Sequence, residues 1–170
     1  MGRSPALDEA PCRRLAAIPE VDVVIEVARG GFVKRGSSGR VDFISPWPCP
    51  FNYGSVPTLL GLDGDLLDAV VLGPRLGRGE RVRVKAWGAI TLTDRGLFDH
   101  KLICSEQPPS EAEFGRVLRF FHCYARCKGL LNLWRRRPGR NACEGWCSAE
   151  VALARARPLS ADGARSPVSF

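Results

Sequence analysis

The chain has 170 residues, 45% of them hydrophobic and 25% charged, which is typical of one folded domain and excludes wholesale disorder. The formal net charge of +7 favours an anionic partner, such as nucleic acid or a phosphate substrate. The sequence has no apolar run long enough to span a membrane, and its first residues lack the apolar core of a signal peptide. We therefore expect a cytoplasmic protein with no membrane partner.

Short strands are predicted through the first two thirds of the chain, after a tail at residues 1–19. The run VDVVIEV at 21–27 alternates β-branched and polar residues, which is typical of a strand. The proline-rich segment 45–54 is predicted to be a loop, because proline cannot donate to a sheet. Further strands are predicted at 33–35, 40–44, 69–73, 82–93 and 101–105. This pattern favours a small barrel or sandwich.

Two helices are predicted to follow the strands. Ser110 and Glu113 form a capping box, and an apolar stripe continues from it to Tyr124 and Ala125. Residues 128–140 are basic and rich in Gly and Pro at their ends, so they are predicted to form a loop. The second helix is expected from Ser148 to about residue 157, where Pro158 stops it.

Two groups of aspartates point to metal chemistry. Asp63, Asp65 and Asp68 lie within six residues, where like charges repel one another unless a cation compensates them. A hard divalent cation prefers such carboxylate oxygens, although a solvated acidic turn would also explain the cluster. Asp94 and Asp99 form a second pair, and we interpret them as the other half of a metal site with a phosphate substrate.

Seven short strings, in the family's own order, resemble the soluble family I inorganic pyrophosphatases. They are VVIE at 23–26, Lys34, FNYG at 51–54, DGDLLD at 63–68, TDRGLFDHK at 93–101, FFHCY at 120–124 and EGW at 144–146. The resemblance implies an α+β, mainly β fold, a five-stranded OB-like barrel with two flanking helices. It places the domain at 20–157, between tails at 1–19 and 158–170.

The resemblance also implies an activity and a set of site residues. The implied enzyme is an inorganic diphosphatase that splits pyrophosphate by in-line attack of a metal-bound hydroxide. Asp65 matches the family's catalytic base. The matching metal ligands are Asp63, Asp68, Asp94 and Asp99, with Glu26 as an outer residue, and the matching substrate-binding residues are Lys34, Tyr53, Lys101 and Tyr124. The expected cofactor is Mg²⁺, as several ions, with Mn²⁺ as the alternative, and a homo-oligomer is expected.

The chain lacks several residues that the family has: one in its aspartate signature, one acidic residue and two cations that bind phosphate. Leu66 follows the second aspartate, Gly36 replaces an acidic residue, and Ala125 replaces the lysine after the helical tyrosine. The family's phosphate-binding arginine has no counterpart, and Arg40 is only nearby. We expect weaker binding at one end of the substrate, unless Arg35 or one of residues 135–137 compensates. An organic diphosphate or phosphate ester therefore stays open as the substrate, as does a catalytically weak relative serving as a basic binding module.

Four cysteines flank the basic segment 128–140. They form two pairs with three intervening residues each, Cys123 with Cys127 and Cys143 with Cys147. Zinc is not expected there, because zinc knuckles usually have two intervening residues. The basic segment and Trp134 could contact nucleic acid. The intact aspartate set favours an enzyme instead, so no nucleic-acid partner is expected.

Overall fold

The computed structural model describes residues 17–35, 41–44, 48–94, 96–134 and 139–159. In chain order its elements are β1 (Glu20–Val27), β2 (Val33–Arg35), β3 (Val41–Ile44), β4 (Asn52–Leu60), β5 (Leu66–Val71), β6 (Arg81–Asp94), β7 (Leu97–Ser105), α1 (Glu111–Trp134), β8 (Ala142–Cys147), α2 (Ala149–Arg155) and β9 (Arg157–Pro158).

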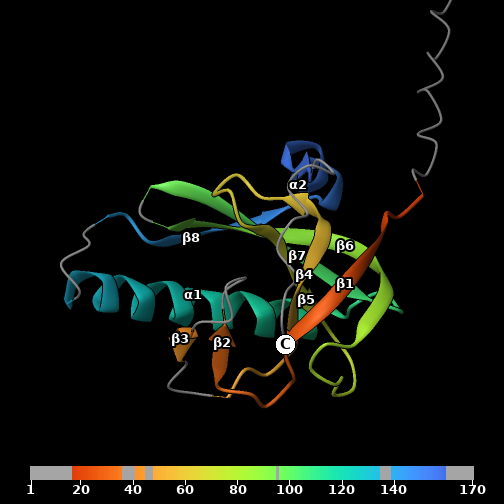
Figure 1. Cartoon of the computed structure of the whole chain (residues 1–170), viewed down its shortest axis with the longest axis horizontal. Helices are drawn as coiled ribbons and strands as arrows, with labels where there is room; N and C mark the ends of the chain where they lie inside the picture. Colours follow the sequence, from red (N-terminus) through yellow and green to blue (C-terminus); the bar gives the residue numbers. More distant parts are fainter. Residues whose placement is uncertain (1–16, 36–40, 45–47, 95, 135–138, 160–170) are drawn as a thin grey trace, which may run out of the picture.

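Five strands form a closed ring, in the order β1, β4, β5, β7, β6 and back to β1 (Figure 1). β5 and β7 run parallel, and the other neighbours in the ring are antiparallel. Alternate residues of β1, from Val21 to Val27, are buried, as expected for a strand with one face toward a core. The ring confirms the predicted five-stranded, OB-like fold, whereas β2 and β3, within the described residues, pair only with each other.

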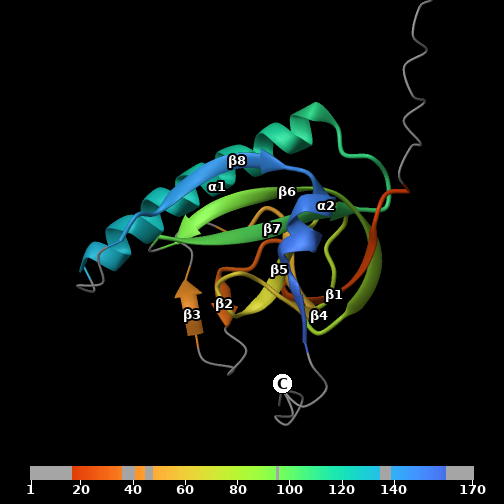
Figure 2. The same cartoon turned by 90° about the horizontal axis from the view of Figure 1, so that it is seen from above.

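The two helices cover different parts of the ring (Figures 1 and 2). α1 packs Val117 and Phe121 on an apolar cluster that includes Val70 and Ile103 of the parallel pair. α2 packs two alanines on a second cluster, formed largely by β1, β5 and β6 with Leu102 and Cys104 of β7. β8 pairs with β6 and extends the sheet beside α1. Strand β7 thus contributes to both cores.

β4 corrects the prediction of a loop at 45–54, because Asn52, Tyr53 and Gly54 open a strand. A Cβ atom on Gly54 would overlap the carbonyl oxygen of Val24, so glycine allows the close approach of β1. Asn52 is fully buried, and its side-chain Oδ1 atom accepts hydrogen bonds from the backbone N–H groups of Arg29 and Leu76. The local signals of Pro and Gly were outweighed by these tertiary contacts.

α1 corrects a second prediction, because residues 128–134 continue the helix instead of forming a loop. The capping box is confirmed: the Ser110 N–H donates to the Glu113 carboxylate, and the Glu113 N–H donates to the Ser110 hydroxyl. A single glycine costs a helix about 1 kcal/mol, so Gly129 is tolerated where neighbouring residues bond to the sheet. β8 was also not predicted. The expected tails lie mostly outside the described residues, and their bounds stay a prediction.

No helix in the described part of the chain is both long enough and apolar enough to cross a membrane.

Candidate active site

A buried lysine joins two aspartates at the centre of the site. Only 2% of the Lys101 side chain is exposed, and its ammonium lies 2.5 Å from Asp68 Oδ2 and 2.9 Å from Asp99 Oδ2. The parallel register of β5 and β7 places Asp68 opposite Lys101. Asp99 and Lys101 are two residues apart, so they share one face of β7. Strand pairing alone therefore brings the three charges together.

Lys101 keeps its charge in spite of this burial. Burial disfavours an ammonium, but the carboxylates of Asp68 and Asp99 raise the pKa of Lys101 well above its usual value. A positive charge fixed between two carboxylates leaves them oriented and partly compensated. The arrangement is suited to the binding of further charged groups at the same place.

Strand β4 adds two hydroxyl groups on the side of Asp68. The Tyr53 hydroxyl donates to Asp68 Oδ2 at 2.5 Å, and the Tyr53 ring lies 5.5 Å from the Lys101 ammonium. Two residues further on, the Ser55 hydroxyl donates to Glu26 Oε1 at 2.6 Å. The register pairs Ser55 with Asp68, so Glu26 is connected to the same surface. Ser55 was not singled out from the sequence, because a lone serine has no recognisable pattern.

The turn before β5 carries the remaining aspartates of the DGDLLD string. Gly64 has a positive φ of 89°, and the Asp65 N–H donates to Asp63 Oδ1 at 3.2 Å. Both aspartates are exposed. Partial loss of water and the neighbouring carboxylates, that of Asp99 first, raise the pKa of Asp63. The turn therefore places the Asp63 carboxylate close enough to Asp99 of β7 for the two charges to interact.

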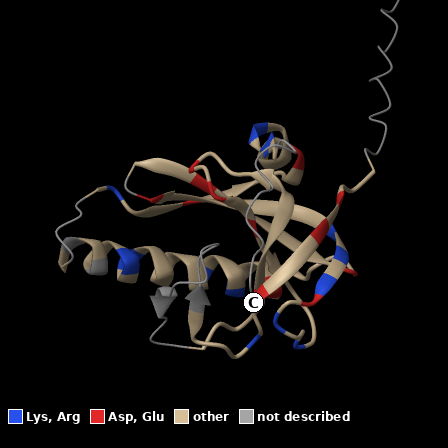
Figure 3. Cartoon of the chain, viewed as in Figure 1, with Lys and Arg blue, Asp and Glu red and all other residues tan. Residues whose placement is uncertain are grey.

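The fifth aspartate, Asp94, lies at the end of β6 and faces α1. Its Oδ2 atom is 2.7 Å from the Lys128 ammonium, and its Oδ1 atom accepts a bond of 3.4 Å from Asn132. The Lys128 ammonium is also 5.8 Å from the ring of Tyr124. Burial opposes this charge, but Tyr124 and Asp94 raise the pKa of Lys128. Figure 3 shows the basic segments of the helix below the acidic segments of the sheet.

The donor chemistry of these residues fits a hard divalent cation. All five aspartates offer carboxylate oxygens, and a cation would relieve both the partial loss of water and the repulsion by Asp99 that raise the pKa of Asp63. Among the described residues, no three Asp, Glu, His or Cys side chains are close enough to hold one ion together. The carboxylates of Asp68 and Asp99 instead lie on Lys101 and that of Asp94 lies on Lys128, and this separation suits several ions that keep part of their water.

Several residues considered from the sequence cannot be placed. The side chains of Lys34 and Arg35 are not described, although both residues belong to β2. Gly36, Arg40 and residues 135–137 lie outside the described part of the chain. The four cysteines are described: Cys123 is exposed, and its three companions are half-buried.

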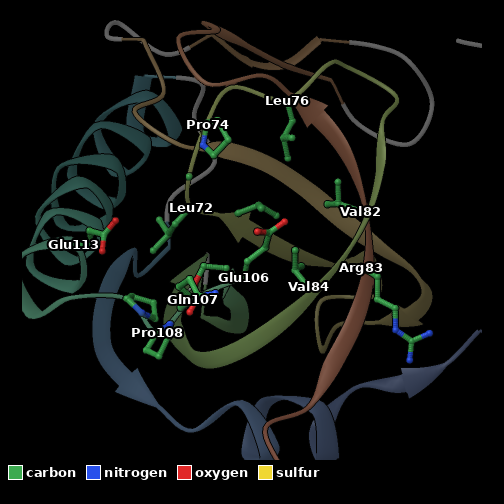
Figure 4. Close-up of a pocket in the computed structure, with 14 residues that line it drawn as sticks. Leu72, Pro74, Leu76, Val82, Arg83, Val84, Glu106, Gln107, Pro108 and Glu113 are labelled. Carbon is green, nitrogen blue, oxygen red and sulfur yellow. The ribbon is translucent and has the colours of Figure 1, made fainter.

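A cavity of about 440 Å³ lies at the far end of β5 and β7, away from the aspartates (Figure 4). Apolar side chains, among them Leu72, Leu76, Val82 and Val84, form most of its wall, and Glu106 and Glu113 supply carboxylates. None of the site residues predicted from the sequence lines it.

The ring of strands and its aspartates define a class of protein, an OB-like domain in which two aspartates hold a buried lysine. The family model described as inorganic pyrophosphatase matches residues 23–125. This match covers more than half of the chain, which therefore belongs to the inorganic pyrophosphatase family, a family of metal-dependent enzymes. The matched range includes every site aspartate and the helical Tyr124.

Relatives and solved structures agree with this assignment. The chain is 34% identical over 125 residues to an inorganic pyrophosphatase of Streptomyces coelicolor, covering 62% of this chain and 77% of that protein. It is 33% identical over 106 residues to one of Gluconobacter oxydans, covering 58% and 61%. A solved structure from Coxiella burnetii is 26% identical with a TM-score of 0.64, covering 81% of this chain and 91% of that one. The chain spans about three fifths of the first curated relatives it matches.

Proposed function

We propose that this chain hydrolyses inorganic pyrophosphate to two phosphates. The observation that carries the proposal is the buried Lys101 between Asp68 and Asp99, with the Tyr53 hydroxyl on the same carboxylate. This group places an ammonium, a phenol and two carboxylates together on one surface of the sheet. Such a surface can bind a polyanion together with its divalent counter-ions. Family membership supports the same substrate.

The aspartates would hold Mg²⁺, with Mn²⁺ as the alternative. The proposed ligands are Asp63, Asp68, Asp94 and Asp99, with Glu26 further out beside Ser55. A bound divalent cation supplies Lewis-acid polarisation of water and of phosphate oxygens. The chain's own part is to fix the carboxylates. Asp68 is held by Tyr53 and Lys101, whereas the exposed turn leaves Asp63 and Asp65 more room to adjust.

The remaining site residues divide into a base and substrate-binding groups. Asp65 is the proposed base, because it matches the family's catalytic base, and its exposed carboxylate on the turn is accessible to water. Lys101 and Tyr53 are proposed to orient phosphate oxygens by charge and by hydrogen bonding. Tyr124 contributes from the helix, where it is within electrostatic reach of Lys101. Lys34 is proposed as a further phosphate ligand from β2.

Phosphate release tests the proposal. The protein is supplied with pyrophosphate, a nucleoside diphosphate or a sugar phosphate ester, each with millimolar Mg²⁺, Mn²⁺ or a chelator. We expect release from pyrophosphate that needs metal and is lost in Asp65→Asn. A folded protein that releases phosphate only from the organic substrates would support the alternative substrate class. A protein that releases none from any substrate would favour the basic binding module.

A homo-oligomer is also proposed. Large apolar side chains are exposed on the β6–β7 hairpin and on α1, namely Leu97, Phe98, Leu130 and Trp134. Exposed apolar groups of this size favour burial against another copy of the chain. Light scattering gives the molar mass, and a monomer that persists at all concentrations would contradict this proposal. The cytoplasmic location stays a prediction from the sequence.

A further inference from the structure

One face of α1 carries polar side chains where an apolar stripe would be expected. Tyr124, Lys128 and Asn132 are spaced four residues apart, so they follow one another along a single face. Asn132 is buried, whereas Tyr124 and Lys128 are half-buried. Residues on the packed face of a helix are usually apolar. Lys128 and Asn132 therefore need polar partners in the sheet.

The partner of this face is the candidate active site. The Lys128 ammonium lies 2.7 Å from Asp94 Oδ2, and the two side chains are 23% and 21% exposed. Asn132 contacts the other oxygen of the same carboxylate, at 3.4 Å. Lys101 is also among the charges that act on Lys128, and its repulsion is the smallest of the influences on the pKa of Lys128. Two cations, one from the sheet and one from the helix, thus approach the same group of carboxylates.

Lys101 is buried and Lys128 is half-buried, so an anion that reaches both is attracted by two positive charges in poorly hydrated surroundings. Asp94 compensates Lys128 in the present arrangement, but the carboxylate would be shared once it holds a divalent cation. The flexible stem of lysine lets its compact charge turn to a new partner without moving the helix. We propose that Lys128 is a substrate-binding residue, whose ammonium binds a phosphate group of the diphosphate and supplies the charge that Ala125 lacks. This inference rests on the proposed function.

A purely structural role would have different consequences. If Lys128 only holds Asp94 in place, its replacement weakens the metal site and the fold but leaves the affinity for a diphosphate at saturating metal unchanged. If Lys128 binds phosphate, the loss of affinity persists at saturating metal. The affinity for a diphosphate, measured apart from catalysis, therefore separates the two roles.

The test is calorimetric binding of imidodiphosphate, a non-hydrolysable diphosphate, at saturating Mg²⁺. Lys128→Gln removes the charge but keeps an amide that can donate to Asp94, and Lys128→Arg restores a charge. Arg126→Ala is the matched control, because it removes one positive charge from an exposed position on the same helix. We expect Kd to rise about tenfold to a hundredfold in Lys128→Gln, as for the loss of one charge-assisted bond. The other two variants should stay within about threefold of the wild type.

Steady-state kinetics supply the second readout. KM for pyrophosphate should rise in Lys128→Gln in parallel with Kd, while kcat changes much less. An unchanged Kd and KM in this variant would overturn the inference, even if the wild type hydrolyses pyrophosphate. A wild type that binds imidodiphosphate through Lys128 but releases no phosphate would overturn only the proposed activity. Lys128→Ala repeats the measurement if the glutamine variant does not fold.

Discussion

The strand side of the candidate active site differs from its helix side in how the side chains are held. On the strand side, Asp68 and Lys101 are paired by the register of two neighbouring strands in a closed ring. On the helix side, Lys128 reaches Asp94 from one face of α1. A strand cannot shift by one residue without turning its side chains to the other face. Residues three or four positions apart share one face of a helix, so a basic residue can occupy a position one turn away and its side chain can still reach the site.

The largest expected effect comes from the strand side. Lys101→Met leaves Asp68 and Asp99 close together without their shared cation, and removing one partner of a buried ion pair costs about 3–5 kcal/mol. We expect the free energy of unfolding in urea to fall by this amount without metal, and activity to be lost. Divalent metal should restore part of the stability. Lys85→Met, at an exposed position of β6, is the control, and an equal loss there would contradict the assignment.

Replacing Asp65 and replacing Asp68 should have different effects on turnover, metal affinity and stability. Asp65→Asn removes an exposed carboxylate, so turnover should fall about 10²–10⁴-fold while metal affinity and stability stay near those of the wild type. Asp68→Asn alters the group that holds Tyr53 and Lys101, so metal affinity and stability should fall as well. Metal titration and urea unfolding of both variants provide the measurement. Equal loss of metal in both would refute the division into base and ligand.

A smaller effect is expected on the helix side from Ala125→Lys. Because Lys128 is proposed to supply the cation already, the added lysine should change KM by less than about threefold in the wild type. In the Lys128→Gln background it should lower KM, since a cation would return to the same face. Only 6% of Ala125 is exposed, so the added side chain should also cost about 1–3 kcal/mol of stability. A large fall of KM in the wild-type background would show that Lys128 does not fill the gap.

The smallest effect contrasts two thiols. Burial raises the pKa of Cys104, on β7, to about 12, whereas Cys123 is exposed on α1. At pH 8 an alkylating reagent should modify Cys123 readily and leave Cys104 unmodified until the protein unfolds. Because the folded-state pKa of Cys104 is raised, its contribution to stability is complete below about pH 8.5 and is lost as pH rises toward 12. Cys104→Ser should flatten that alkaline decline in the unfolding midpoint.

Local patterns predicted those parts of the fold whose cause is local. The capping box of Ser110 and Glu113 formed as expected, because its bonds join residues three apart. Strand β1 was predicted because its alternation of apolar and polar residues is visible within the strand itself. β4 was missed because a glycine such as Gly54 is typical of turns. In the structure, Gly54 instead allows the backbone of Val24 in β1 to approach closely. The end of α1 was missed because Gly129 and the basic residues are typical of a loop. The contacts of Lys128 and Asn132 with Asp94 hold this segment as a helix.

The sequence by itself determined the family and the identity of the clustered acids, since both depend on short strings in a fixed order. Only the tertiary structure decided which cations face those acids. Asp68 meets Lys101 through a parallel strand pair, and Asp94 meets Lys128 across a sheet and a helix. The physical reason is that a carboxylate attracts any cation within reach, at any separation along the chain. Which cation lies within reach is fixed by strand register and helix placement.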